Sequence, residues 1–410
     1  MKSYLTIRLL NLTLRVLTML AKFLLIIYIG KYFSVEALGE YGLFVITVTI
    51  SMFFLGMDFY TYNSREIIGT EEKNRFTLIR DQFVFHILVY VVVLPLLFII
   101  FLFDIISYQY MLLFYVLLIM EHLAQELYRL YTTLSMPIFA NILLFLRMAS
   151  WVYVLILLWI YDIKDTQNLY FVYLSWFIAS TLSVIIGFWY LFKLYDKDAL
   201  KSKVDWIWIK KGFKISIPFL IGTIAYKVIE FSDRYMINHY MEKIDVGVYT
   251  FFGNIANSMQ SVVFVLVIMI FYPKLIELYK DEKFDEFNLK IKRFFLEVFI
   301  YSIITIIAII IFIHPVLEYL GKQEFIKNLD ILWILLGATL VLNLSFVPHY
   351  ILFVKHKDIV IRNVTLFAAG LNIVLNIILI PTYGLIGAGV ATLNSFLFIL
   401  IIKNYKAKDV

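Results

Sequence analysis

The chain of 410 residues has no cysteine, only seven prolines, and a charged fraction of just 16%. The lack of cysteine excludes disulfide bonds, thiolate metal sites and a cysteine nucleophile. About a quarter of the residues in a soluble domain are charged. The low charged fraction, beside a hydrophobic fraction of 62%, is therefore typical of a membrane protein.

Motifs for catalysis and metal binding are also missing from the sequence. There is no glycine-rich phosphate loop, no pair of histidines spaced for a metal and no cluster of aspartates. His86, His122 and His349 fall within predicted helices, where packing or hydrogen bonding is the expected role. We expect no catalytic residue, no metal, no cofactor, and a protein that is not an enzyme.

Apolar runs of about 20 residues recur along the whole chain, and each is long enough to cross a bilayer as a helix. The sequence therefore predicts an all-α polytopic membrane protein with about twelve transmembrane helices. Their predicted ranges are 4–30, 40–60, 82–103, 110–132, 139–160, 169–192, 214–240, 247–272, 294–314, 329–354, 359–380 and 384–402.

The lysines and arginines of the loops predict the orientation of these helices. With the N-terminus in the cytoplasm, about 24 of the 36 basic residues fall in cytoplasmic segments and five in outer loops. This bias is the one expected of cytoplasmic loops, so both termini are predicted to be cytoplasmic. The net charge of +6 then reflects the placement of the loop lysines, and we expect no nucleic-acid partner.

A weak internal repeat divides the chain into two halves. Leu38-Gly39-Glu40-Tyr41 corresponds to Val246-Gly247-Val248-Tyr249, and aligning the two glycines places Lys22 opposite Glu230 and Arg15 opposite Thr223. We predict an N-terminal lobe at residues 1–200 and a C-terminal lobe at 201–410, each with six helices in the same orientation.

The first predicted helix carries a continuous polar stripe. Its members step by three or four residues and therefore share one helix face: Arg8, Asn11, Arg15, Thr18 and Lys22. A cation near the middle of a lipid-facing helix costs at least a few kcal/mol. The stripe is expected to face either a wet cavity or another helix, whereas Arg8 lies close enough to the surface to extend into it.

Further polar residues lie deep in later helices. The cations are Arg147, Lys227 and Arg234; Asn254 and Asn257 share a face of the eighth helix with Thr250 and Ser261, where cavity lining and helix–helix contact are equally open. Among the acids, Asp58 and Glu230 are candidates for ion coupling. Static pairing of Glu230 with Lys227, and of Asp233 and Arg234 with other helices, is an alternative.

The cations outnumber the acids inside the predicted membrane region. A basic cavity suits an anionic ligand such as a phosphate ester, which arginine can bind with two donors. The predicted substrate-binding residues are Arg15, Lys22, Arg147, Lys227, Arg234, Asn254 and Asn257.

Several short motifs together resemble the polysaccharide repeat-unit exporters, the O-antigen (Wzx-type) flippases of the MATE-like, or MOP, transporter superfamily. The motifs are Leu38-Gly39-Glu40-Tyr41-Gly42, Ile217-Pro218-Phe219, Ser232-Asp233-Arg234-Tyr235-Met236-Ile237, Gly247-Val248-Tyr249, and the stretch from Leu375 through Pro381 to Thr392. The resemblance covers essentially the whole chain.

The resemblance implies two six-helix lobes in a V that open alternately to each side. It implies as cargo an undecaprenyl-pyrophosphate-linked oligosaccharide for O-antigen, lipopolysaccharide, capsule or exopolysaccharide synthesis, carried to the outer face of the bacterial inner membrane. Membrane lipids, a polysaccharide polymerase and chain-length proteins are the implied partners.

Three other functions remain open. A cation-coupled multidrug exporter of the same fold should have an acidic cavity, and a lipid II flippase usually has two more helices. A polytopic transferase or polymerase needs a long loop outside the membrane, and the connections between the predicted spans are too short for one.

Overall fold

The computed structural model of the chain describes residues 2–194 and 201–408, with side chains from residue 9 onward. The described residues contain no strand, which confirms the predicted all-α fold. The long helices are α1 (Lys2–Tyr32), α2 (Val35–Gly56), α4 (Glu72–Leu96), α6 (Met111–Thr133), α9 (Leu169–Leu194), α10 (Trp206–Tyr240), α11 (Lys243–Val263), α13 (Phe284–Leu320), α15 (Asp330–Val354) and α16 (Asp358–Lys408).

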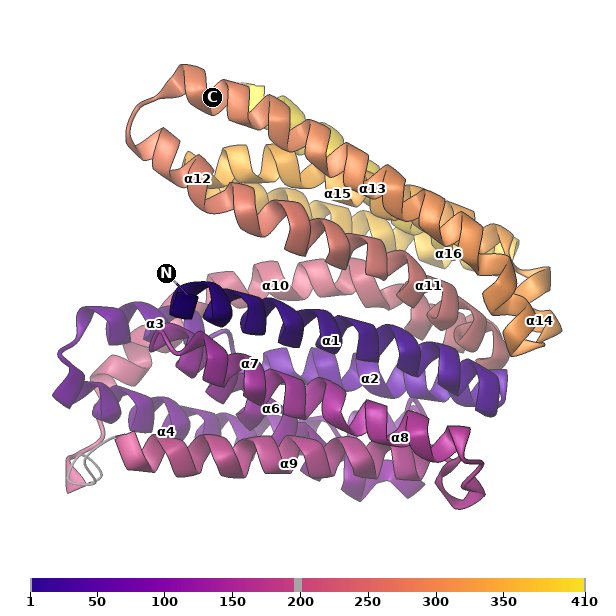
Figure 1. Cartoon of the computed structure of the whole chain (residues 1–410), viewed down its shortest axis with the longest axis horizontal. Helices are drawn as coiled ribbons and strands as arrows, with labels where there is room; N and C mark the ends of the chain where they lie inside the picture. The colour runs from indigo at the N-terminus through magenta and orange to yellow at the C-terminus, as the bar shows by residue number, and fades with distance from the viewer. Residues whose placement is uncertain (1, 195–200, 409–410) are drawn as a thin grey trace. The chain divides into compact units, whose positions relative to one another are not determined.

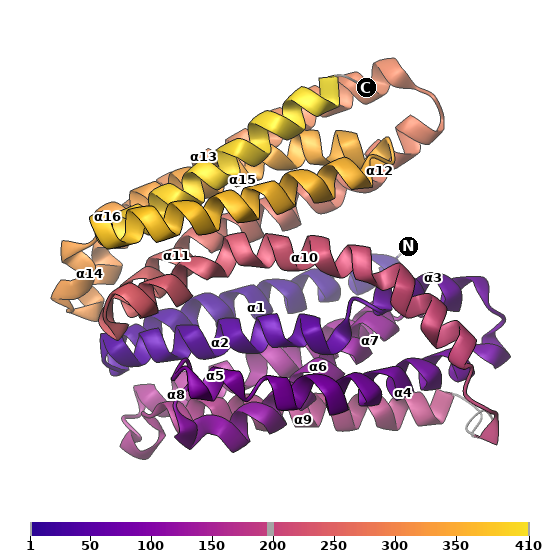
Figure 2. The same cartoon turned by 180° about the vertical axis from the view of Figure 1, so that it is seen from behind.

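Shorter elements complete or connect these helices (Figure 1), and α5 is labelled in the view from behind (Figure 2). They are α3 (Tyr60–Gly69), α5 (Ile99–Leu102), η1 (Tyr108–Tyr110), α7 (Pro137–Phe145), the π-helix η2 (Leu146–Ser150), α8 (Trp151–Ile160), η3 (Lys164–Thr166), the π-helix η5 (Phe264–Ile268), α12 (Met269–Lys280) and α14 (Gln323–Lys327). The run α7–η2–α8 forms one candidate membrane span, and so does α11–η5–α12.

The described residues form eleven helical segments long and apolar enough to cross a membrane. The last of them, α16, has 51 residues and would be about 77 Å long if straight, more than twice the hydrocarbon thickness. Gly384 interrupts it with a φ of 59° and a ψ of −137°. A Cβ on Gly387 would overlap the carbonyl oxygen of Leu379, so the chain reverses here. Because α16 is two spans joined at Gly384, the prediction of about twelve helices is confirmed.

Several helices extend beyond their predicted ends. α13 begins at Phe284 instead of residue 294, and α4 begins at Glu72 instead of residue 82. The first turns of α13 carry exposed charged residues, which the prediction had assigned to a loop. Charged side chains are compatible with a helix wherever it leaves the hydrocarbon, so hydropathy marks the membrane boundary and not the helix end.

The chain forms two compact units, which we call unit 1 (Met1–Tyr28 and Leu43–Thr223) and unit 2 (Ile29–Gly42 and Ile224–Val410). The predicted division between residues 200 and 201 borders the segment 195–200, which lies outside the described residues. The observed change falls within α10, because Trp208 and Ile209 of its first turns pack with Phe59, Tyr62 and Phe85 of unit 1. Six helices per lobe stays a prediction.

Within unit 2, two glycines allow α2 and α11 to cross closely; we call this contact the glycine crossing. A Cβ on Gly39 would overlap the carbonyl oxygen of Lys243, and a Cβ on Gly247 would overlap that of Val35. Each glycine therefore meets the residue four positions before the other. The spacing of 208 residues from Gly39 to Gly247 also separates the ends of α1 and α10 and the starts of α2 and α11, in agreement with the repeat register.

Candidate functional site

The polar stripe of α1 contacts another helix of unit 1. The half-buried Arg15 donates from Nε to Asn141 Oδ1 at 3.4 Å, and Asn141 Nδ2 donates to Asn11 Oδ1 at 2.8 Å. Asn141 lies on α7, so this part of the stripe has a helix as its neighbour. Lys22, further along α1, is exposed.

Arg147 lies in the π-helix η2 and is only 3% exposed. Its Nη1 lies 3.4 Å from Glu121 Oε1, and its Nη2 donates to Gln125 Oε1 at 2.5 Å. The other oxygen of Glu121 accepts hydrogen bonds from Trp176 Nε1 at 3.1 Å and Ser180 Oγ at 2.7 Å. The guanidinium of Arg147 is thus part of a buried network that joins η2, α6 and α9.

The predicted polar residues of α10 pair along that helix, in unit 2. Lys227 Nζ and Glu230 Oε2 are 2.6 Å apart, as the pairing alternative anticipated. Arg234 Nη1 lies 3.4 Å from Asp233 Oδ1 and donates to the carbonyl oxygen of Glu230 at 2.9 Å. Asp233 and Arg234 thus pair with each other, and the guanidinium of Arg234 also lies 5.6 Å from the ring centroid of Tyr249 on α11, so the expected contact with another helix is present beside the pair.

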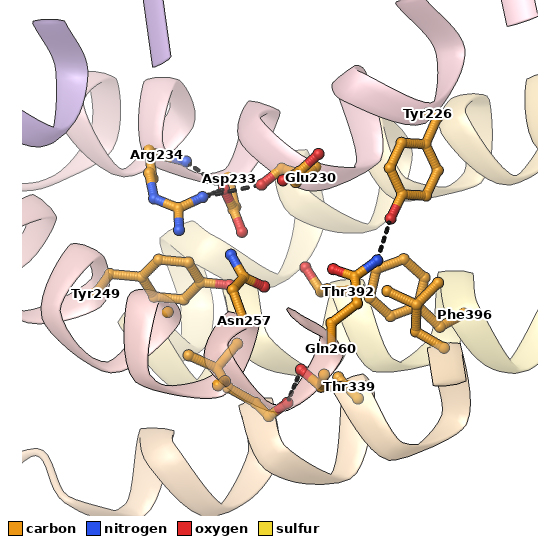
Figure 3. A pocket seen from close by; sticks show the side chains of 15 residues that line it. Tyr226, Glu230, Asp233, Arg234, Tyr249, Asn257, Gln260, Thr339, Thr392 and Phe396 are labelled. Atoms are coloured by element: carbon orange, nitrogen blue, oxygen red, sulfur yellow. Dashed lines mark hydrogen bonds and ion pairs between the residues drawn. The ribbon is translucent and has the colours of Figure 1, made fainter. Parts of the chain in front are cut away.

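A cavity of about 30 Å³ lies beside these pairs in unit 2 (Figure 3). Glu230, Asp233 and Arg234 line it from α10, and Asn257 and Gln260 line it from α11. Gln260 Nε2 donates to the hydroxyl of Tyr226 at 3.0 Å, and Thr339 and Thr392 complete the polar lining. This volume holds a water molecule or a small ion but not a sugar.

Of the predicted site residues, the structure brings Glu230, Arg234 and Asn257 together at this cavity. Asn254 is exposed, and its amide donates to the carbonyl oxygen of Thr250 on the same helix at 2.8 Å. Arg15, Lys22, Arg147 and Asp58 belong to unit 1, and Lys227 belongs to unit 2.

Asp58 follows the end of α2, where Met57 and Asp58 both have left-handed backbones with φ of 49° and 50°. Its Oδ2 accepts a hydrogen bond from Thr223 Oγ1 at 2.7 Å. Burial raises the pKa of the Asp58 carboxyl above its ordinary value, and this bond opposes the rise in part.

The sequence interpretation did not include Asn141 or Gln125, and it did not pair Glu121 with Arg147. Each of these residues is a polar residue inside an apolar span, and this pattern could have indicated them, because such a residue needs a partner at a similar depth. Among the described residues, His86, His122 and Glu126 are also close enough to share an ion, with ligand atoms within 4.8 Å of one another.

Comparison with solved structures shows which known fold the chain shares. An inward-facing multidrug MATE transporter of the MOP superfamily is similar with a TM-score of 0.73 at 12% identity, over 98% of this chain and 97% of that one. The lipid II flippase MurJ, in an inward closed conformation, also gives 0.73, at 15% identity over 98% and 87%. At such identities the similarity shows the fold, which is the MATE-like fold of the MOP superfamily.

A MOP superfamily transporter from Pyrococcus furiosus Vc1 is similar more loosely, with a TM-score of 0.51 at 12% identity over 97% of this chain and 93% of that one. No curated protein matches the sequence. A model of the polysaccharide biosynthesis protein family matches residues 8–279, well over half of the chain, and the chain belongs to this family.

Proposed function

We propose that the protein is a flippase that moves undecaprenyl-diphosphate-linked oligosaccharide repeat units from the cytoplasmic to the outer face of the bacterial inner membrane. Membership of the polysaccharide biosynthesis family is the observation that carries this proposal. The fold adds support, because a lipid II flippase with the same architecture is among the similar structures.

The cations inside the spans supply the chemistry that a diphosphate needs. On α1, Arg15 is half-buried and Lys22 is exposed, so the diphosphate headgroup of the substrate can reach both side chains. Arg147, Lys227 and Arg234 are each next to a carboxylate in this conformation. A diphosphate binds Lys227 or Arg234 by exchanging with the carboxylate, since both anions accept charge-assisted hydrogen bonds from the same donors. Arg147 would need a conformation in which Glu121 releases it.

Transport proceeds in this proposal by alternating access of two six-helix lobes, with the termini in the cytoplasm. No nucleotide is needed, because an ion gradient can drive the cycle. Asp58 and Glu230 are candidate ion carriers, and a polysaccharide polymerase and chain-length proteins are the proposed partners that use the exported unit.

The cavity of unit 2 bears on the multidrug alternative, because two carboxylates and one guanidinium line it. That balance suits a cation. We assign the cation to coupling and not to cargo, because about 30 Å³ is too small for a drug molecule.

Deletion of the gene in its host, followed by mass spectrometry of the lipid-linked intermediates, tests this function. We expect complete repeat units on undecaprenyl diphosphate to accumulate, with plasmid-borne protein restoring export. Purified protein in liposomes should then move the extracted lipid-linked oligosaccharide between leaflets. Normal export in the deletion strain, with no other flippase present, contradicts the proposal.

A further inference from the structure

Unit 1 holds a buried cluster of ionisable groups that the proposed substrate path does not use; we call it the histidine cluster. It consists of His86 on α4 and of His122 and Glu126 on α6, each at most 2% exposed. His86 Nε2 lies 3.5 Å from Glu126 Oε2, and His122 Nε2 lies 3.9 Å from Glu126 Oε1. Both imidazoles therefore point a nitrogen at the same carboxylate.

The surrounding groups fix the orientation of all three side chains. Tyr90 Oη is 2.6 Å from His122 Nδ1, and Gln82 Nε2 donates to Glu126 Oε2 at 2.6 Å while lying 3.3 Å from His86 Nε2. Arg129 Nη1 pairs with Glu126 Oε1 at 2.6 Å. Such outer partners hold the ring of a buried histidine in one position and define which nitrogen faces the site.

The charge count decides which ion the cluster suits. Glu126 and Arg129 already balance each other, so a divalent metal would leave two uncompensated positive charges in a site excluded from water. One added proton leaves a single positive charge, placed beside a carboxylate. The histidine cluster therefore suits a proton far better than a divalent metal, although three potential ligand atoms are present.

His122 Nε2 is the atom prepared for this proton. It is buried and has no hydrogen-bond partner among the described residues. A proton on it forms a charge-assisted N–H···O bond to Glu126 once the 3.9 Å separation shortens by about 1 Å. The proton thereby satisfies a buried nitrogen that otherwise carries a desolvation cost.

Other charged and titratable groups face the histidine cluster from the neighbouring elements. The ring of Tyr60 on α3 lies 3.7 Å from the guanidinium of Arg129, and Asp58 acts electrostatically on Glu126 and Arg129. The positive charges of Arg129 and Arg147 also act on His122. Tyr90 is the titratable neighbour from α4.

The histidine cluster also contacts the end of α2, where the backbone leaves the helical conformation. A Cβ on Gly56, the last residue of α2, would lie 2.9 Å from His122 Nε2 and 3.8 Å from Glu126 Oε1. The next two residues, Met57 and Asp58, have the left-handed backbones described above. A change in charge at His122 therefore alters the electrostatic environment of the residues that connect α2 to α3.

We propose that His86, His122 and Glu126 form a proton-binding site that couples transport to the proton gradient. In each cycle one proton enters from water, binds His122 Nε2 beside the ionised Glu126, and leaves to the aqueous phase on the other side. The coupling role rests on the proposed flippase function, whereas proton binding itself does not.

Nuclear magnetic resonance of the full-length protein in liposomes, labelled with ¹⁵N-histidine, tests proton binding directly. His86→Gln and His122→Gln assign the two signals, and over the pH range in which the protein stays folded we expect acidification of wild type to convert the His122 signal to the protonated form, with the His86 signal changing in the same step. Glu126→Gln should abolish the transition, and Tyr90→Phe, which only removes the partner of His122 Nδ1, should move its midpoint. The half-buried His349, in unit 2, supplies the control variant His349→Gln, which should leave both signals unchanged.

Two results overturn the proton site. One is a pair of signals that stay neutral across this range, or that titrate in Glu126→Gln as they do in wild type. The other is a stoichiometric divalent metal in the purified protein that His122→Gln removes, because the cluster is then a metal site.

Coupling is measured in liposomes that contain the lipid-linked oligosaccharide extracted from the deletion strain. With one proton per molecule, a difference of one pH unit can build an approximately tenfold ratio between leaflets. We expect wild type and His349→Gln to approach that ratio and His122→Gln to remain near one to one. Accumulation that survives in both His86→Gln and His122→Gln overturns the coupling role. If wild type moves no lipid-linked oligosaccharide at all, the proposed function fails instead, and the resonance titration still decides the proton site.

Discussion

The buried charges of the two units are arranged in different ways. In unit 1, Glu121 and Arg147 lie on different elements, and their partners extend to α9. In unit 2, the pairs Lys227–Glu230 and Asp233–Arg234 both lie within α10, beside a small cavity. The ion pair of unit 1 therefore joins different helices, whereas the ion pairs of unit 2 form within α10.

This difference distinguishes ion pairs that stabilise the packing of helices from ion pairs that can release one partner to a ligand. A carboxylate that joins three elements cannot leave its cation without loosening the unit. A pair within one helix turn, with a cavity next to it, can exchange a partner for a ligand at little cost in packing. Arg147, which the sequence presents as a substrate ligand equal to Lys227, has in this conformation the contacts of a structural residue.

The largest expected effect comes from breaking the network of unit 1. Glu121→Ala leaves Arg147 buried without its carboxylate, and removing one partner of a buried pair costs about 3–5 kcal/mol. We expect a large fall in the unfolding temperature of the purified protein in detergent. Lys227→Ala is the matched control in unit 2; because its pair is about one-fifth exposed and lies within one helix, the loss should be smaller than that in Glu121→Ala. Equal losses in the two variants would remove the distinction between the units.

Arg15→Ala tests the same comparison by its effect on transport, as opposed to stability. Arg15 is half-buried, so its removal should change the unfolding temperature little, yet a charge-assisted contact to a diphosphate is worth about 1.5–3 kcal/mol. We expect export to fall at least about tenfold at normal protein levels, with Arg15→Lys keeping part of it. Full activity of a folded, inserted Arg15→Ala protein assigns the stripe of α1 to helix packing alone.

Gly247→Ala should have a smaller effect on stability. The added methyl group overlaps the carbonyl oxygen of Val35, and overpacking of this kind typically costs about 1–3 kcal/mol. Gly370→Ala, at a position where a Cβ meets no other atom within 4 Å, should be neutral or slightly stabilising. The measurement is again thermal unfolding, and a neutral Gly247→Ala means that the crossing is looser than the structure shows.

The smallest effect is expected from Asp58→Asn, which keeps an acceptor for Thr223 but removes the titratable group. The pKa of Asp58 is raised in the folded state, so wild type loses stability as the pH rises from about 4 toward the folded-state value. The asparagine variant does not lose this stability. It should therefore unfold at a slightly higher temperature near neutral pH and at the same temperature below about pH 4. A lower unfolding temperature at neutral pH would show that the ionised carboxylate stabilises the fold.

The spans were predictable because hydrophobic length is a local property of the sequence. The reversal at Gly384 was predictable in the same way, from two apolar runs on either side of it. The helical turns before Phe294 were not, because a charged sequence outside the hydrocarbon fits a helix or a loop equally well.

The site was predictable only in part. The pair Lys227–Glu230 follows from their spacing on one helix, whereas the pair Arg147–Glu121 depends on how η2 packs against α6. The histidine cluster was hidden for the same reason. His86 and His122 lie on different helices, and only their packing shows that both face Glu126.

The glycine crossing has a mechanical consequence for a distant part of the molecule. α2 leaves unit 2 at Gly42 and enters unit 1 at Leu43, and the stretch from Gly42 to Gly56 is a helical rod about 21 Å long. If the helices pivot by about 10° at the crossing, the far end of this rod sweeps about 4 Å. That far end is Gly56, which lies against His122. The glycine crossing and the proposed proton site thus lie near opposite ends of one helix, α2, and spin labels flanking Gly56 would record a pivot at the crossing.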